Sequence, residues 1–291
     1  MKQPFISTRH FLFIAVCLQM MICPLLAVSP VPENQANMDL YELPSPLFAF
    51  GQFIVPKGWR YLTGVFYGLE GRHMPRTEFW PRFTYGLRDD LTLTVYPEIA
   101  LILQNSTGKS KGLEDTVLRL EYQVFKKDVH EAKLRMTVLG ALFLPTGSVR
   151  KNPPTSFGGT SYFMGSTLAY LEHRWYFFCS EFIQLTTKRH HTRLGRRFFY
   201  EWGGGFNLYV IPKTITTVLL EFSGELIAKD IIKGKTDCNS GGNTIFCGPS
   251  VLVGNDSWWV QGGCVFPIAQ RLNGTQPRAA HYWGVYVGVR V

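Results

Sequence analysis

Apolar and polar residues alternate through the last ten positions of the chain, 282–291. Valines and Trp283 occupy the odd positions, whereas Gly, Tyr and Arg290 occupy the even ones. A period of two predicts a β-strand whose two faces meet different surroundings. Ten residues also match the roughly 9–11 that a tilted strand needs to cross a bilayer. A soluble protein could bury such a face too, so the interpretation depends on how often the pattern recurs.

Segments with strand character recur along the chain from Gly58 onward. In one of them, Leu134, Met136 and Val138 alternate with Arg135 and Thr137. The alternation predicts twelve strands, although the register within 161–187 is ambiguous. The predicted strands are 59–70, 76–86, 91–102, 115–125, 133–145, 161–171, 174–187, 196–210, 214–228, 244–254, 258–268 and 280–291.

Tight and long connections alternate between these segments. The tight ones include 87–90, 172–173 and 255–257. The long ones are 104–114, 146–160, 188–195, 229–243 and 270–279. Outer-membrane barrels have this layout, with short periplasmic turns and long outer loops. The sequence therefore predicts an all-β fold, an up-and-down antiparallel transmembrane β-barrel of about twelve strands.

The start of the chain predicts export. Lys2 and Arg9 precede an apolar run that ends in small residues near Ser29, which is typical of a cleaved signal peptide over residues 1–29. A membrane-anchoring helix is the alternative. The proline-rich residues 30–57 are interpreted as a leader that lines or plugs the barrel mouth, or stays loose. Residues 58–291 then form the barrel.

The composition limits the classes of binding partner that we expect. The formal net charge is +9, aromatic residues make up 14%, and there are 28 glycines, as strands with interfacial rings and tight turns require. A basic chain could bind nucleic acid, but an exported chain seldom meets it. We therefore expect the outer membrane of a Gram-negative bacterium as the location, with outer-membrane lipid and lipopolysaccharide as partners and no nucleic acid. The sequence leaves the oligomeric state open.

Ionisable side chains within the strands should face the lumen, because a charge on the lipid face costs about 2–4 kcal/mol near the midplane. They could form a selectivity ring for a small-molecule solute or a structural ladder of ion pairs. The predicted lumen-facing residues are Arg119, Glu121, Arg135, Glu201, Glu221 and Glu225.

A basic cluster marks one long connection. It is either a solvated loop or a platform for lipopolysaccharide phosphates, which Arg and Lys bind through charge-assisted hydrogen bonds. Its members are Lys188, Arg189, Arg193, Arg196 and Arg197. In the next long connection, Cys238 and Cys247 flank a Gly/Asn-rich stretch. In an oxidising compartment they either form a disulfide or remain free.

Catalytic motifs are not apparent. His281 and Ser257 would lie at opposite ends of the barrel, which excludes a Ser/His/acid set between them. Zinc-ligand spacing, a phosphate loop and paired carboxylates are also missing from the sequence. We therefore expect that the chain is not an enzyme and that it holds no cofactor or metal.

Three short stretches occur in a familiar order. Residues 86–93 (GLRDDLTL) lead into Tyr96-Pro97, residues 112–115 read GLED, and residues 144–147 read LPTG. Together they resemble the outer-membrane barrel family named for the meta-pathway of phenol degradation, often labelled "transporter". The resemblance covers residues 80–150 by motif and implies a channel that passes small, often aromatic, compounds. The chain departs from the family at Val291, where an aromatic residue usually ends the barrel.

These features predict an outer-membrane channel for passive passage of small solutes, hydrophobic or aromatic compounds among them. The alternative is a barrel with a closed lumen that acts as a surface scaffold or adhesin through its outer loops.

Overall fold

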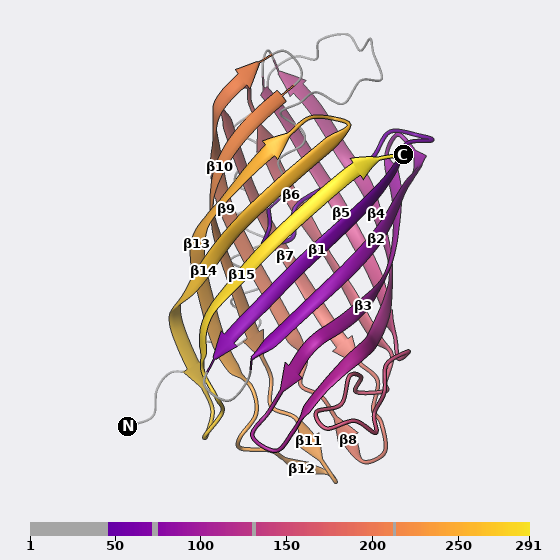
Figure 1. Cartoon of the computed structure of the whole chain (residues 1–291), viewed down its shortest axis with the longest axis vertical. Coiled ribbons are helices and arrows are strands. Elements are labelled where there is room, and N and C mark those ends of the chain that lie inside the picture. Colours follow the sequence, from indigo (N-terminus) through magenta and orange to yellow (C-terminus); the bar gives the residue numbers. More distant parts are fainter. Residues whose placement is uncertain (1–45, 72–74, 130–131, 212–213) are drawn as a thin grey trace.

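Twelve long strands close into one antiparallel barrel in the computed structural model, which describes residues 46–71, 75–129, 132–211 and 214–291 (Figure 1). The last strand pairs with the first along its whole length, with Tyr61 opposite Arg290 and Tyr67 opposite Gly284. The strands are β1 (Arg60–Gly71), β2 (Arg76–Arg88), β3 (Leu91–Gln104), β4 (Lys109–Val129), β5 (Ala132–Leu144), β6 (Ser161–Leu171), β7 (Trp175–Thr186), β9 (Arg197–Ile211), β10 (Thr214–Ile227), β13 (Gly242–Gly254), β14 (Trp258–Leu272) and β15 (Ala279–Arg290).

All twelve predicted strands are present, and most of their ends agree with the alternation to within two residues. The strand β4 differs most, since it begins at Lys109 instead of residue 115. Irregularities in its pairing with β3, between Pro97 and Ile99 and between Ala100 and Leu103, explain the difference. A bulge shifts the side-chain alternation, so the pattern hid the extension. The ambiguous segment 161–187 forms β6 and β7.

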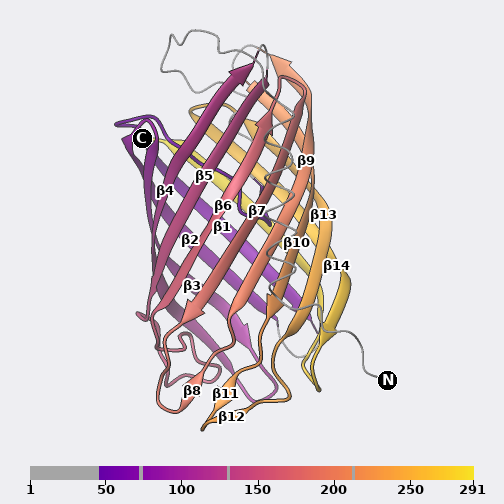
Figure 2. The same ribbon diagram turned by 180° about the vertical axis from the view of Figure 1, so that it is seen from behind.

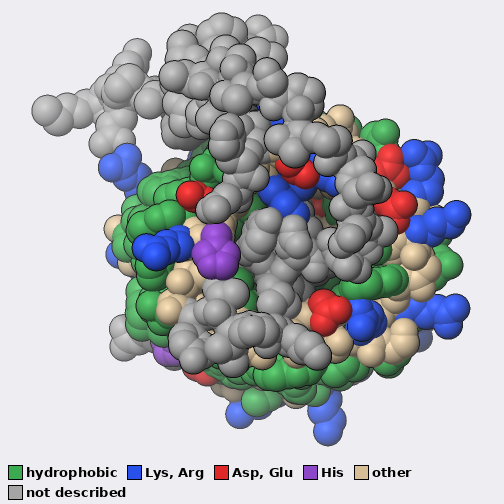
Figure 3. Space-filling model, turned by 90° about the horizontal axis from the view of Figure 1, so that it is seen from above, with side chains coloured by type: hydrophobic (Ala, Val, Ile, Leu, Met, Phe, Trp, Pro, Cys, Tyr) green, Lys and Arg blue, Asp and Glu red, His purple; other side chains and the backbone are tan. Residues whose placement is uncertain are grey.

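The two faces of the wall differ in polarity, as the alternation predicts. On β10, Leu220 is 49% exposed outside the barrel, whereas its neighbour Glu221 is 0% exposed inside. The valines of β15 and the leucines of β4 repeat this outward exposure. Figure 3, which looks onto the end where the C-terminus lies, shows hydrophobic side chains around the outer wall. Such a belt suits contact with hydrocarbon, because polar groups there have no water to bind.

The two ends of the barrel also differ (Figures 1 and 2). Tight turns join β2 to β3 and β13 to β14 at the end where the C-terminus lies, which we call the short-turn end. The other end, the long-loop end, carries a small separate sheet of β8 (Thr192–Arg193), β11 (Ile231–Ile232) and β12 (Lys235–Thr236). In outer-membrane barrels the short turns face the periplasm and the long loops face outward.

The buried core fills the lumen. Inward rings of the wall, such as Tyr61 and Tyr176, are almost completely buried, and Leu47 and Val55 from before β1 are buried with them. The predicted signal peptide and residues 30–45 of the predicted leader lie outside the described residues. Within the described part of the chain, no helix has the length and hydrophobicity needed to span a membrane.

Candidate functional site

Residues 46–57, which we call the plug, run inside the barrel, where Phe50 contacts rings near the long-loop ends of β6, β7 and β9 and the later residues reach the short-turn end. The backbone N–H of Leu47 donates to Oε1 of Glu221 at 3.0 Å, in the middle of β10. The N–H of Val55 donates to Oγ1 of Thr92 at 2.8 Å, where β3 begins. The second half of the predicted leader therefore occupies the lumen itself, more deeply than a segment confined to the mouth would.

Three buried wall carboxylates bind the plug backbone. Besides Leu47, Glu221 accepts the next N–H along the plug at 2.7 Å. Glu201 accepts the N–H of Phe50, and Glu121 accepts that of Phe53 at 2.9 Å. Each of the three side chains is at most 2% exposed. A buried polar group left without a partner costs about 1–3 kcal/mol, so these hydrogen bonds satisfy the carboxyl oxygens and the plug N–H groups together.

Wall side chains donate to the same carboxyl groups, to the second oxygen of Glu201 and of Glu121 and to the Oε1 of Glu221 that also accepts the Leu47 N–H. The donors are Ser250 to Glu221, Ser223 to Glu201 at 3.0 Å, and Arg119 to Glu121 at 2.5 Å. The plug and the wall thus share one hydrogen-bond network, in which the plug supplies only backbone groups.

Aromatic rings pack around the same segment. The Phe50 ring lies 4.8 Å from both Phe163 and Phe182, measured between centroids. Nearer the short-turn end, the Phe53 ring lies 5.7 Å from that of Trp259. Aromatic pairs at these separations stabilise by about 0.5–1.5 kcal/mol beyond the burial of their area. Two phenylalanines therefore anchor the plug among rings of the wall.

The plug leaves the lumen over the β2–β3 turn. The N–H of Lys57 donates to Oδ1 of Asp89, and that of Gly58 donates to the carbonyl oxygen of Gly86, each at 2.9 Å. A Cβ on Gly86 would lie 2.1 Å from the carbonyl oxygen of Pro56. Only glycine allows so close an approach of two backbones. The β2–β3 turn, which the sequence predicts as a tight connection between two strands, therefore also binds the plug.

All six predicted lumen residues lie on inward-facing positions. Three of them bind the plug, and Arg119 assists Glu121. Near the short-turn end, Arg135 contacts Asp128, and near the long-loop end Glu225 pairs with Arg197 at 3.2 Å. Glu121 and Glu225 belong to ion pairs of the wall, as a structural ladder would have, but Glu121, Glu201 and Glu221 also bind the plug, a segment that the alternation could not place. The one sequence signal was a run of apolar residues, 47–50, inside a proline-rich leader.

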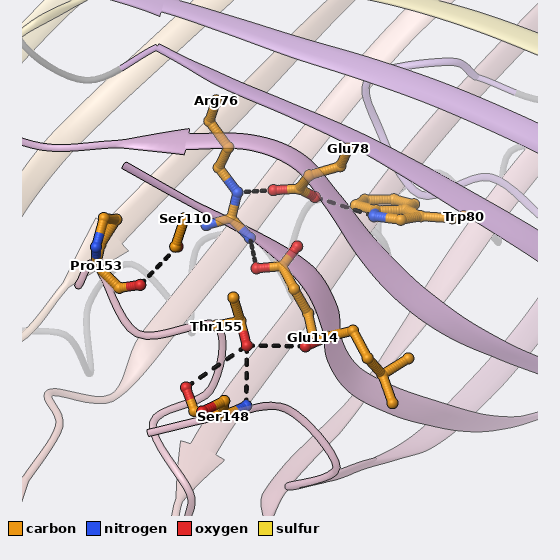
Figure 4. Close-up of polar contacts among 9 residues, drawn as sticks. Arg76, Glu78, Trp80, Ser110, Glu114, Ser148, Pro153 and Thr155 are labelled. Carbon is orange, nitrogen blue, oxygen red and sulfur yellow. Dashed lines mark hydrogen bonds and ion pairs between the residues drawn. The ribbon is translucent and has the colours of Figure 1, made fainter. Parts of the chain in front are cut away.

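The long-loop half of the lumen beside β2 and β4 is held by side chains of the wall instead (Figure 4). Nη2 of Arg76 lies 3.0 Å from Oε1 of Glu114, and Nε of Arg76 contacts Glu78. The indole of Trp80 donates to Oε2 of Glu78 at 2.9 Å. These contacts cross from β2 to β4 over β3 and leave the plug untouched.

Between these halves, Arg82 points into a group of aromatic rings. Its Cζ lies 5.1 Å from the centroid of Trp80, 4.7 Å from that of Tyr96 and 5.8 Å from that of Tyr286. Among the described residues, no acceptor reaches its Nε. Attraction between a cation and aromatic faces holds the guanidinium there. The middle of the lumen is thus aromatic around one arginine.

The predicted basic loop lies at the long-loop end. Nη1 of Arg189 donates to the carbonyl oxygen of Phe157 at 2.9 Å, and Arg197 pairs with Glu225. Lys188, Arg193 and Arg196 are exposed.

Cys238 and Cys247 are both free, which is the second of the two states that the sequence left open. The strand β13 begins at Gly242, so Cys247 stands about five residues, or roughly 16 Å, up a strand that rises about 3.3 Å per residue. Its neighbours Phe246 and Gly248 lie on the inward positions, which places Cys247 on the outer face. Cys238 stays in the exposed loop before the strand.

Known structures share this fold. The crystal structure of an outer membrane channel from Pseudomonas putida F1 matches with a TM-score of 0.69 and 11% identity, over 81% of this chain and 97% of that one. LpxR from Salmonella typhimurium matches with a TM-score of 0.41 and 9% identity, over 79% and 99% of the two chains. No protein-family model matches the sequence, and no curated protein matches it significantly. The closed wall, its apolar outside and this fold identify an outer-membrane β-barrel.

One expectation from the sequence needs correction. Missing catalytic motifs led to the prediction that the chain is not an enzyme, but LpxR, a barrel of similar architecture, is an enzyme. The barrel architecture therefore gives no ground for that prediction, and a TM-score of 0.41 transfers no activity to this chain. In the part of the chain that the structure describes, no three His, Cys, Asp or Glu residues are grouped to hold a metal ion.

Proposed function

We propose that the protein is an outer-membrane channel for small apolar or aromatic solutes and that its own plug, residues 46–57, closes it. The observation that carries the proposal is the way the plug is held. Hydrogen bonds to Glu121, Glu201 and Glu221 and ring contacts fix it in place. These contacts are reversible, so one segment can leave the lumen while the wall stays closed.

The wall does not need the plug for its own closure. Ladder pairing between β1 and β15 runs from Tyr61 to Gly71 with one irregularity near its end. The plug adds no strand to the barrel and pairs with no strand edge. Its departure would expose lumen side chains to water, at a cost in buried apolar area, but would break none of the strand pairs that close the wall.

The nature of the lumen surface supports the solute class. The rings that surround Phe50 offer an aromatic solute the contacts that they now make with the plug. On β2, β3 and β15, Trp80, Tyr96 and Tyr286 continue the aromatic surface around Arg82. The resemblance of residues 80–150 to a family that passes small aromatic compounds points the same way. The matched Pseudomonas putida structure is called an outer membrane channel, which supports the channel part of the proposal only.

Planar-bilayer recording tests the proposal. Wild-type protein is compared with a variant in which a Gly/Ser linker of equal length replaces residues 46–55. We expect rare, brief openings for the wild type and a sustained conductance for the variant. Heat-modifiable migration in SDS gels confirms that both barrels are folded. A folded variant without single-channel steps would show that the lumen is not a pore.

The filled lumen also favours a second candidate, a closed barrel that serves as a surface scaffold or adhesin through its long loops. The same recording separates the two. A scaffold has no reason to conduct after the plug is replaced, because the remaining lumen side chains would be arranged only to support the wall.

A further inference from the structure

Two long loops join into one rigid unit at the long-loop end. The strand β8 pairs with β11, with Ile231 opposite Arg193, and β11 pairs with β12. The N–H of Lys233 donates to the carbonyl oxygen of His191 at 2.7 Å. Backbone pairing therefore connects residues 187–196 with residues 228–241, which the sequence had treated as separate loops.

The joined loops bring together cations that lie far apart in the sequence. The cluster expected from residues 188–197 gains further lysines from the β11–β12 hairpin. The exposed cations of the unit, which we call the basic platform, are Lys188, Arg193, Arg196, Lys229, Lys233 and Lys235. None of them takes part in the ion pairs found among the described residues.

The acidic residues of the same unit are already engaged. Oδ1 of Asp230 accepts the N–H of Gly195 at 2.7 Å, which ties the two loops together. Oδ1 of Asp237 accepts the N–H of Asn239 at 2.9 Å within its own turn. Both carboxylates thus serve the backbone of the unit. The cations dominate its surface charge.

The platform lies just beyond the apolar belt. The strands that lead into it end at Thr186 on β7 and Ile227 on β10, and β9 starts at Arg197. Their last outward residues are apolar, as at Leu185 and Leu226. In an outer-membrane barrel the long loops face outward, so the platform stands at the height of the outer-leaflet head groups.

We propose that the basic platform binds the phosphate groups of the lipid A part of lipopolysaccharide. Arginine and lysine form charge-assisted hydrogen bonds with phosphate, and basic surfaces at this depth attract anionic head groups. A sheet that fixes cations from two loops reduces the conformational freedom that binding would otherwise remove. The inference does not depend on whether the plug opens.

A matched pair of variants tests it. The platform variant carries Arg193→Gln, Arg196→Gln, Lys233→Gln and Lys235→Gln. The control variant carries Lys109→Gln, Lys111→Gln, Arg150→Gln and Lys151→Gln, which are exposed cations on the same rim. The control region is also structured, since Thr155 donates to the carbonyl oxygen of Leu113 at 2.8 Å and Ser110 to that of Pro153 at 2.7 Å (Figure 4). Both variants lose the same charge.

Native mass spectrometry of detergent-purified protein measures binding of bisphosphorylated lipid A and of its dephosphorylated form. We expect the platform variant to bind the phosphorylated lipid at least about 10-fold more weakly than wild type, and the control variant to stay within about 2-fold. All three proteins should bind the dephosphorylated lipid equally weakly.

Equal losses of affinity in the two variants would show that net charge, and not a specific site, determines lipid binding, and would overturn the proposal. Unchanged binding in the platform variant, or equal affinity of wild type for both lipids, would do the same. Should the fourfold variant fail to fold, the double change Lys233→Gln and Lys235→Gln at the hairpin replaces it, with an expected loss of at least about 3-fold.

Discussion

The two halves of the lumen are filled in different ways. From the rings around Phe50 to the short-turn end, a separate segment occupies the space, and wall carboxyl groups bind its backbone. In the long-loop half beside β2 and β4, Arg76 bridges Glu78 and Glu114, so the wall fills its own interior. The first arrangement can be undone by moving one segment. The second can be undone only by rearranging side chains of β2 and β4.

This difference separates contacts that close the channel from contacts that shape it. A substitution at the plug should change how often the lumen opens, whereas a substitution at Arg76 should change the lumen without releasing the plug. Plug release can be followed with Gln52→Cys in a background without other cysteines, because Gln52 is 8% exposed in the closed state. Its labelling by a membrane-impermeant maleimide reports the open fraction.

The largest expected effect comes from Phe50→Ala. Truncation of a fully buried Phe costs about 3–5 kcal/mol. Phe50 is half-buried but contacts three rings of the wall, so we expect a loss near the lower end of that range, and it falls on the docked plug. We expect Gln52→Cys labelling at least about 100-fold faster than with Phe50 present. Phe143→Ala is the matched control, since the Phe143 ring contacts Phe163 at 6.3 Å between centroids but lies on the wall. Equally fast labelling in the control would mean that general loosening of the wall releases the plug.

Glu221→Gln should have the next largest effect. The amide keeps the size of the side chain but puts an N–H donor in place of one of the two oxygens that now accept plug N–H groups. A buried donor left without its partner costs about 1–3 kcal/mol, and the amide retains one of the two acceptors. We therefore expect labelling of Gln52→Cys to rise by roughly 10- to 100-fold. Labelling as slow as in the wild type would mean that the rings alone hold the plug.

The sequence predicted the wall far better than what fills it. Alternation at Leu220 and Glu221 specifies the two faces directly, because a strand in a barrel meets hydrocarbon on one side only. The plug has no such period. Its residues are placed by acceptors on β3, β4, β9 and β10, which lie between 37 and 174 positions away. Long-range partners of an irregular segment leave no local pattern in the sequence.

The joining of the two long loops was equally invisible in the sequence. The basic residues near Lys188 were visible as a cluster, but their union with Lys233 depends on the β8–β11 pairing of two-residue strands. Strands so short carry no readable alternation. The state of Cys238 and Cys247 stayed open for a related reason. The predicted strand 244–254 already contained Cys247, but the sequence did not show which face of the wall its side chain takes relative to the loop that carries Cys238.

Gly86→Ala should loosen the plug where it leaves the lumen. The added Cβ would lie 2.1 Å from the carbonyl oxygen of Pro56, and a backbone atom cannot rotate away. Overpacking typically costs about 1–3 kcal/mol, so labelling of Gln52→Cys should rise by roughly 5- to 100-fold. Gly140→Ala is the control, because a Cβ there meets nothing within 4 Å. A similar rise in both variants would trace the effect to strand glycines in general.

Arg76→Gln should have the smallest effect on the plug, and comparison with Arg119→Gln makes this decisive. Both arginines pair with a buried glutamate, but only Glu121, the partner of Arg119, also binds the plug. The Arg76 side chain is 41% exposed, so solvent screening keeps its contribution to stability below about 1 kcal/mol. Labelling of Gln52→Cys should therefore change less than about 2-fold in Arg76→Gln and clearly more in Arg119→Gln. If Arg76→Gln released the plug as readily, the two halves of the lumen would form a single coupled network, and closure could not be assigned to the plug contacts alone.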